Sequence, residues 1–93
     1  MKQITVVMAT CNGSRYLLPQ LESIRHQSML PGELIISDDA STDDTYDLAL
    51  QFAKTAPFPT VVVRNSQRLG YIENFLRGLT HARFEYIALF RSG

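Results

Sequence analysis

The stretch Leu-Ile-Ile-Ser-Asp-Asp-Ala-Ser-Thr-Asp-Asp-Thr at residues 34–45 contains the features that decide the fold of this chain. Its first three residues are apolar and two of them are β-branched. Such a run is typical of a strand buried on both faces of a parallel sheet. The Ser-Thr-Asp-Asp at 41–44 is typical of a helix N-terminus, where the helix dipole favours acidic side chains. A buried strand, a polar turn and a helix in this order indicate one unit of an α/β protein.

The same alternation extends along the whole chain, because residues 4–9, 61–63 and 86–90 are further strand candidates. Strands that alternate with helices of about a dozen residues are connected by right-handed crossovers and run parallel. The sequence therefore predicts a three-layer α/β/α domain whose four-stranded parallel sheet has the chain order βαβαβαβ. Ser14 is the predicted N-cap of the first helix. The predicted apolar helix faces are Leu17, Leu21 and Ile24; Leu48, Ala49, Phe52 and Ala53; and Ile72, Phe75, Leu76 and Leu79. The aromatic side chains expected in the core are Phe52, Phe75 and Phe90.

Composition limits the classes of protein to which the 93-residue chain can belong. Nine Lys and Arg balance nine Asp and Glu, and this zero net charge argues against nucleic acid or an anionic membrane as the main partner. The single cysteine, Cys11, cannot form an internal disulfide, which fits a reducing compartment. The apolar run near the start is too short for a signal peptide or a membrane span. We therefore expect one small cytoplasmic globular domain.

The paired aspartates Asp38 and Asp39 lie at a strand end, where ligands of parallel sheets bind. Adjacent strand residues point to opposite faces, so the two carboxylates should have different tasks. One can cap backbone N–H groups, while the other can point into a crevice and accept hydrogen bonds from a ring N–H or a ribose hydroxyl. The alternative is that both only cap turns. Asp43 and Asp44 are expected to cap the following helix.

A phosphate cradle is absent from the sequence, because no glycine-rich G-x-G-x-x-G or G-x-x-x-x-G-K motif follows the first strand. A nucleotide would then be held mainly through its base and ribose. Arg64 and Arg68 are either phosphate or base ligands or, as we favour, solvated loop residues. Tyr71 is a candidate stacking residue at the rim of the crevice. His26 and His81 lack the spacing of metal ligands.

Five segments carry a resemblance to a known family: VVMATCNG at 6–13, Tyr-Leu at 16–17, LIISDDASTDDT at 34–45, GYIENF at 70–75 and EYIAL at 85–89. Together they resemble the opening of family 2 glycosyltransferases, which are inverting, nucleotide-sugar-dependent enzymes of the GT-A fold. The G-x-x-x-N-F pattern is similar to rhamnosyltransferase-like members that build bacterial surface polysaccharides. The resemblance implies that residues 1–93 are the N-terminal, nucleotide-binding half of a Rossmann-like GT-A domain.

The resemblance also implies a set of binding residues. Asp39 would accept the base N–H of a UDP- or dTDP-sugar, and Asp38 would brace the neighbouring loop. Thr10, Cys11 and Asn12 would line the base and ribose. Family members usually have an aromatic residue at the position of Cys11, often to stack on the base, so the cysteine implies weaker packing there.

Two further residues belong to the GYIENF motif, Gly70 and Asn74, for which the resemblance implies support of the binding site. In the family, a strand like EYIAL leads into an acidic motif, often Ser-Asp-Gln-Asp-Asp, that binds Mg²⁺ or Mn²⁺. Here residues 90–93 read Phe-Arg-Ser-Gly instead. A one-nucleotide shift in a gene encoding Ser-Asp-Gln-Asp would give Phe-Arg-Ser-Gly and a stop codon, which is one hypothesis for this difference.

This difference leads us to expect a truncated fragment. The acceptor-binding half and the catalytic base would lie beyond residue 93, so we expect no catalytic residue, no metal ligand and no cofactor in this chain, and little or no sugar transfer by it. Apolar faces that the other half would cover should promote self-association. We expect a cytoplasmic location; for the full-length enzyme, peripheral attachment to the inner membrane is a second possibility.

Two other classes of protein remain open at this point. One is a non-catalytic nucleotide-binding or assembly module. The other, less favoured, is a receiver-type phospho-switch domain, which also uses paired acidic residues at a strand end. That class has its acidic pair after the first strand, whereas here the first strand ends in Thr-Cys-Asn.

Overall fold

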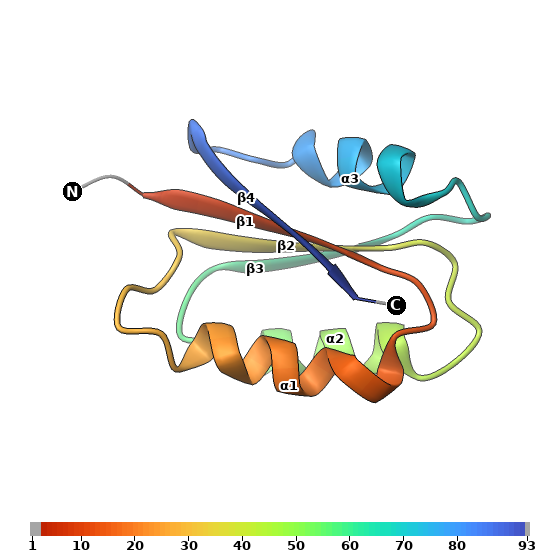
Figure 1. Cartoon of the computed structure of the whole chain (residues 1–93), viewed down its shortest axis with the longest axis horizontal. Helices are drawn as coiled ribbons and strands as arrows, with labels where there is room; N and C mark the ends of the chain where they lie inside the picture. Colours follow the sequence, from red (N-terminus) through yellow and green to blue (C-terminus); the bar gives the residue numbers. More distant parts are fainter. Residues whose placement is uncertain (1–2, 93) are drawn as a thin grey trace.

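The computed structural model describes residues 3–92 as three layers, with α1 and α2 on one face of a β-sheet and α3 on the other (Figure 1). This arrangement confirms the predicted α/β/α fold and the order βαβαβαβ. Among the described residues, no helix is long and apolar enough to cross a membrane. The elements are β1 (Ile4–Thr10), α1 (Ser14–Arg25), β2 (Glu33–Asp38), α2 (Thr45–Thr55), β3 (Thr60–Arg64), α3 (Tyr71–Leu79) and β4 (Tyr86–Ser92).

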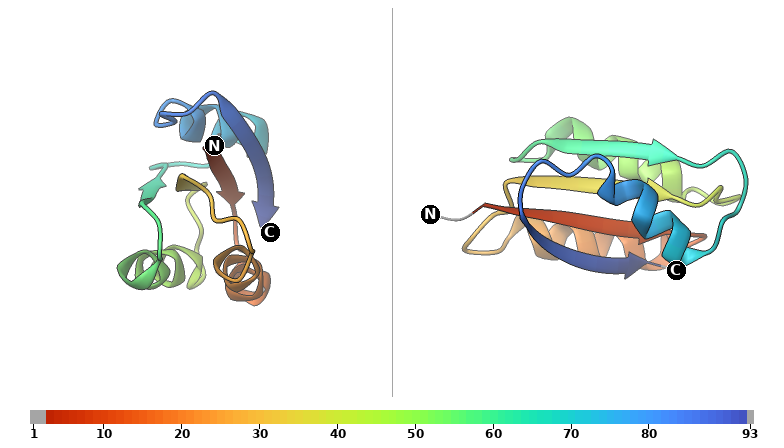
Figure 2. Two further views of the ribbon diagram at one scale, coloured as in Figure 1. Left: turned by 90° about the vertical axis from the view of Figure 1, so that its left-hand side faces the viewer. Right: turned by 90° about the horizontal axis from the view of Figure 1, so that it is seen from above.

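The four strands form one parallel sheet in the order β3-β2-β1-β4 (Figure 2). Val7 of β1 pairs with Ile35 of β2 on one side and with Leu89 of β4 on the other. β1 and β2 are therefore central and almost entirely buried, which agrees with their continuous apolar runs. β3 and β4 are edge strands. The parallel strands bring their carboxyl ends to one edge of the sheet.

The main core lies between the sheet and the layer formed by α1 and α2. The predicted stripe of α1 is fully buried there, together with β1 and β2 residues that point to this face. Burying each large apolar side chain contributes about 1.5–3 kcal/mol. The buried residues of this core are Val6, Met8, Leu17, Leu21, Ile24, Leu34, Ile36, Ala49, Phe52 and Phe58.

Helix α3 is oriented differently from the prediction. Its apolar stripe was expected to face the sheet, but Ile72 and Leu76 are 62% and 51% exposed. Asn74 and Gly78 face the sheet instead. A Cβ atom added to Gly78 would lie 2.7 Å from Val7 Cγ1, so only glycine permits this close approach of helix and strand. The helical period identifies an apolar face of α3 correctly, but it does not specify which layer that face covers.

Edge strand β4 also differs from the prediction in one residue. Phe90 was expected in the core, but it is 37% exposed, because no element covers β4 on its outer side among the described residues. Leu89, which points to the other face, is exposed as well. The β4 side chains on the α3 side of the sheet and the outward stripe of α3 are exposed and apolar, and we call them together the α3–β4 face; its large side chains are Ile72, Leu76, Ile87 and Leu89.

The N-termini of α1 and α2 are joined through Asp43. Gly13, and not the predicted Ser14, is the N-cap of α1. Because glycine has no side chain, the N-cap residue itself makes no side-chain hydrogen bond to the helix. Asp43 instead accepts hydrogen bonds from the backbone N–H groups of Ser14 (3.2 Å) and Thr45 (2.9 Å), and from the Thr45 hydroxyl. Burial acts to raise the pKa of the Asp43 carboxyl, but these hydrogen bonds outweigh it and lower the pKa from 3.8 to about 2.

The orientation of α3 predicts opposite effects for two neighbouring alanine substitutions. Gly78→Ala should destabilise the fold by about 1–2 kcal/mol, because the clash with Val7 exceeds the gain in helix propensity. Leu76→Ala should change the stability by less than about 1 kcal/mol, because its side chain is exposed. Urea unfolding of the two variants measures both effects. A large loss for Leu76→Ala with none for Gly78→Ala would show that the apolar stripe faces the sheet after all.

The hydrogen bonds of Asp43 predict a specific loss of stability in acid. The folded-state pKa is below the unfolded-state value, so the stabilisation is complete above about pH 4 and is lost as the pH falls towards about 2. Urea midpoints measured between pH 6 and pH 2.5 should therefore fall more steeply for the wild type than for Asp43→Asn. Asp47→Asn, which changes an acidic residue in the first turn of α2, is the control and should follow the wild type. Parallel curves for wild type and Asp43→Asn would contradict this role.

Candidate functional site

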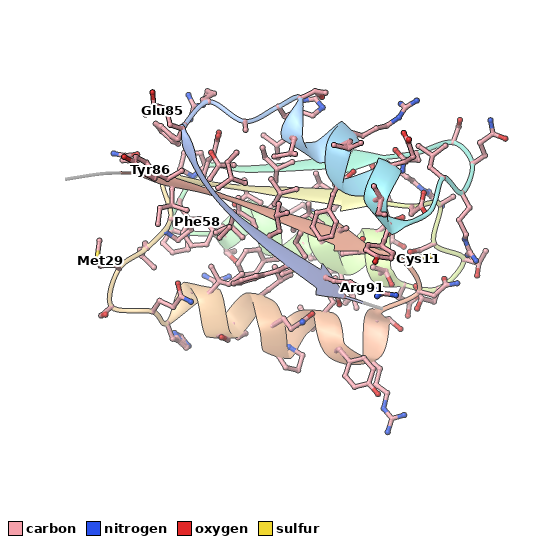
Figure 3. The ribbon with its side chains drawn as sticks, turned by 45° about the horizontal axis from the view of Figure 1, so that its top comes forward. Cys11, Met29, Phe58, Glu85, Tyr86 and Arg91 are labelled. Atoms are coloured by element: carbon pink, nitrogen blue, oxygen red, sulfur yellow. The ribbon has the colours of Figure 1, made fainter. Side chains whose placement is uncertain are left out.

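A pocket of about 260 Å³ lies where the carboxyl ends of β1 and β4 meet the N-terminus of α3. Figure 3 shows Cys11 and Arg91 at this end of the molecule, while Met29 and Tyr86 lie at the opposite end. Of the predicted site residues, the structure brings five to this pocket and leaves Asn12 and Asp38 outside its lining. The lining residues are Ala9, Thr10, Cys11, Asp39, Arg68, Gly70, Tyr71, Asn74, Arg91 and Ser92.

Asp39 is the acidic residue of this lining, and its carboxylate is only 2% exposed. Its Oδ1 atom accepts hydrogen bonds from Asn65 Nδ2 (2.9 Å) and Leu69 N (2.8 Å), and its Oδ2 atom accepts one from Gly70 N (2.9 Å). Burial acts to raise its pKa, but these bonds and the charge of Arg68 outweigh it and lower the pKa below the ordinary value. A carboxylate oxygen can accept two hydrogen bonds, so Oδ2 can accept one more.

Asp38 has different partners on the opposite face of the strand. Its fully buried carboxylate accepts hydrogen bonds from the Thr10 hydroxyl (2.7 Å), the Ser41 hydroxyl (2.6 Å) and the Ser41 backbone N–H (3.0 Å). Arg64 Nε lies 3.9 Å from its Oδ2 atom. These contacts join the ends of β1 and β2, and they occupy Arg64 away from the pocket. The neighbouring aspartates therefore hold two different loops.

Cys11 and Asn12 form the loop that follows β1. The Cys11 thiol lies 3.7 Å from the carbonyl oxygen of Asp39, and burial raises its pKa, so the thiol is protonated near neutral pH. Asn12 has a positive φ of 49°. Its Oδ1 atom accepts a hydrogen bond from Thr42 N (2.8 Å), and its own N–H donates to Ser41 Oγ (2.8 Å). Asn12 therefore fixes the loop that carries Cys11 instead of lining the pocket.

Asn74 attaches α3 to the strand ends through a buried amide network. Its Oδ1 atom accepts hydrogen bonds from Ser37 Oγ (2.7 Å) and Asn65 Nδ2 (2.9 Å). Its Nδ2 atom donates to the Ser37 carbonyl oxygen (2.7 Å) and, more weakly, to that of Thr10 (3.4 Å). Sequence reasoning missed Ser37 and Asn65, for which the only signal is their place at the ends of the second and third strands.

Gly70 and Tyr71 begin α3 at the rim of the pocket. Gly70 has a φ of +91°, and a Cβ atom there would meet nothing within 4 Å, so backbone conformation and not space requires glycine. The guanidinium of Arg91 lies 4.4 Å from the centre of the Tyr71 ring, and Phe75 contacts that ring edge-on at 6.4 Å. One face of the predicted stacking residue is thus covered by an arginine that sequence reasoning did not select.

The donors and acceptors of this pocket fit an anionic ligand that carries an N–H group. Asp39 supplies a fixed ionised acceptor, while Arg68 and Arg91 supply positive charge. Within residues 3–92, no group of three or more His, Cys, Asp and Glu side chains is placed to hold a metal ion. The pocket lining therefore combines a hydrogen-bond acceptor with two positively charged side chains.

Comparison with known proteins identifies the family. The model of Glycosyl transferase family 2 matches residues 5–90. The chain is 36% identical over 91 residues to "Abequosyltransferase RfbV" of Salmonella typhimurium, an alignment that covers 96% of this chain and 27% of the relative.

Two solved structures share the architecture. Mannosyltransferase PcManGT from Pyrobaculum calidifontis, in complex with GDP-Man and Mn²⁺, has a TM-score of 0.83 and 28% identity over 91% of this chain and 26% of its own. S. aureus TarS 1-349, in complex with UDP, has a TM-score of 0.83 over 97% of this chain and 27% of its own; at 22% identity this likeness shows the fold alone. The chain thus spans about a quarter of the length of these proteins. The family match excludes the receiver-type interpretation. The chain belongs to the family 2 glycosyltransferases, and its described residues form the N-terminal part of their GT-A fold.

Proposed function

We propose that this chain is the nucleotide-sugar-binding part of an inverting glycosyltransferase. The donor is a UDP- or dTDP-sugar, and the acceptor is a glycan or a lipid-linked glycan of a bacterial surface polysaccharide, as in rhamnosyltransferase-like members of the family. The names of the relatives support this class: one is an abequosyltransferase, and TarS has been solved with UDP and with UDP-GlcNAc. The balanced charge and the single cysteine support a cytoplasmic enzyme; for the full-length protein we propose peripheral contact with the inner membrane.

The observation that carries this proposal is the state of Asp39. Three N–H donors fix its carboxylate in the ionised form at the pocket, and Oδ2 can accept one more hydrogen bond. Uracil and thymine each present a ring N–H, which a carboxylate accepts. Thr10 and Cys11 line the pocket beside Asp39 and would contact the same base and its ribose. The proposed base pocket therefore selects a ring with a donor at this position.

Asp39 is the acidic side chain that lines the pocket among the described residues. The carboxylates of Asp38, Asp39 and Asp43 are all held by hydrogen bonds of the fold itself. We therefore propose that residues 1–93 bind nucleotide but transfer little or no sugar alone, which makes them a non-catalytic nucleotide-binding module when separated from an acceptor-binding half.

Nucleotide preference tests the role of Asp39. The wild-type chain should bind UDP and dTDP more tightly than CDP, because cytosine presents a lone pair where uracil presents an N–H group. Asp39→Asn should weaken UDP binding by about tenfold or more, since a hydrogen bond to a charged group contributes about 1.5–3 kcal/mol. It should also abolish the preference for UDP over CDP. Isothermal titration calorimetry measures each affinity.

Asp47→Asn, on α2 and outside the pocket lining, is the matched control and should bind like the wild type. The ratio of UDP to CDP affinity separates base recognition from a general loosening of the 65–70 loop, because loosening lowers both affinities. Equal binding of UDP and CDP by the wild type would contradict the role of Asp39.

We also propose that the α3–β4 face joins two copies of this chain. The edge strand β4 leaves backbone hydrogen-bonding groups available for pairing, apolar side chains flank it, and the chain has no net charge to oppose association. Sedimentation velocity should show a mass that rises with concentration for the wild type, and Leu89→Lys should shift it towards the monomer. Leu50→Lys, at an exposed leucine of α2, should not. A wild-type chain that remains monomeric at all concentrations would contradict this association.

A further inference from the structure

We propose that this pocket binds the diphosphate of its nucleotide through Arg68 and Arg91, without a divalent cation. The inference rests on the proposed nucleotide-binding function and specifies how the charge of the ligand is neutralised. Both arginines line the pocket that contains Asp39, and they belong to separate segments, the loop after β3 and the end of β4.

The residues present do not fit the Mg²⁺ or Mn²⁺ ion that the family implies. Such ions take about six oxygen ligands, of which protein carboxylates supply the charge. Asp39 is the acidic residue of the pocket lining, and three N–H donors already hold its carboxylate. Asp38 is bonded to Thr10 and Ser41 on the other face of its strand. Two guanidinium groups beside the same pocket would repel a cation.

Arg91 occupies a position from which it can bind a phosphate group. It pairs in register with Ala9 of β1, and its guanidinium stacks on the Tyr71 ring at 4.4 Å. Stacking uses the flat face of a guanidinium, whereas a phosphate group is bound through the N–H groups at its edge. Stacking on Tyr71 thus orients the guanidinium plane of Arg91 at the rim of the pocket.

Arg68 is positioned through the loop that Asp39 holds. The carboxylate of Asp39 accepts hydrogen bonds from Asn65, Leu69 and Gly70, which lie on both sides of Arg68 in the sequence. Arg68 lines the same pocket as Asp39 and Cys11, and its positive charge helps to lower the pKa of Asp39 and partly opposes the rise in the pKa of Cys11 that burial causes. The residue proposed to recognise the base therefore also positions one of the two phosphate ligands.

The backbone adds positive potential in the same place. Helix α3 begins at Tyr71 and directs its N-terminus to the pocket, where the partial charge of a helix favours anions. The helix end reinforces the two arginines. A planar guanidinium also binds two phosphate oxygens at once, so two arginines can neutralise the charge of a diphosphate.

Calorimetry of the whole chain with uridine, UMP and UDP, in EDTA and in Mn²⁺, tests this inference. We expect UDP to bind at least about tenfold more tightly than uridine in EDTA, since each charge-assisted contact contributes more than 1.4 kcal/mol. Addition of Mn²⁺ should change UDP affinity by less than about threefold. Arg91→Gln and Arg68→Gln should each weaken UDP binding by about tenfold and leave uridine binding unchanged.

Arg77→Gln is the matched control, because it removes one positive charge as the other two variants do. Arg77 is in α3 and lines a different pocket, together with Thr80 and His81. It should bind UDP like the wild type. Three outcomes would each overturn the inference while leaving base recognition intact. They are equal affinity for uridine and UDP in EDTA, tight UDP binding only with Mn²⁺, and unchanged UDP affinity in both arginine variants. No binding of either ligand would overturn the proposed function and this inference together.

Discussion

The buried carboxylate of Asp39 is the interaction on which the site depends. It lies at the end of β2 and accepts three hydrogen bonds, from Asn65, Leu69 and Gly70. The loop after β3 and the start of α3 are therefore both attached to this one carboxylate. A buried charge is stable only when such donors compensate its lost hydration. The same bonds give the pocket a fixed acceptor and a fixed wall, which a solvated carboxylate on a flexible loop would not provide.

A second constraint is the contact between α3 and the sheet. Asn74 satisfies backbone and side-chain groups at the strand ends, and Gly78 permits close approach to Val7. The amide network is therefore on the inner face of the helix and its apolar stripe on the outer face. Leu76 illustrates the consequence: its exposure fits relatives whose chains are about four times as long as the aligned region, in which further polypeptide can cover this face.

The site combines features that family resemblance alone does not join. Asp39 lines the pocket, and Asp38 accepts a hydrogen bond from the Ser41 hydroxyl in the loop after β2. Arg91 lies near the end of β4, and it lines the same pocket as Arg68. The pocket lining therefore carries positive charge from two separate segments, the loop after β3 and the end of β4.

The sequence by itself determined the order of elements, the parallel sheet and the α1 stripe of Leu17, Leu21 and Ile24, because apolar periodicity is a local property that survives in any packing. It also placed Asp38 and Asp39 on opposite faces of one strand. Only the tertiary structure decided which way α3 turns, that Gly13 and not Ser14 is the N-cap of α1, that Asn65 bonds to Asp39, and that Arg68 and Arg91 line one pocket. The physical reason is that these contacts join residues far apart in the chain, so they depend on the sheet order and on the space each neighbour leaves, which no local pattern contains.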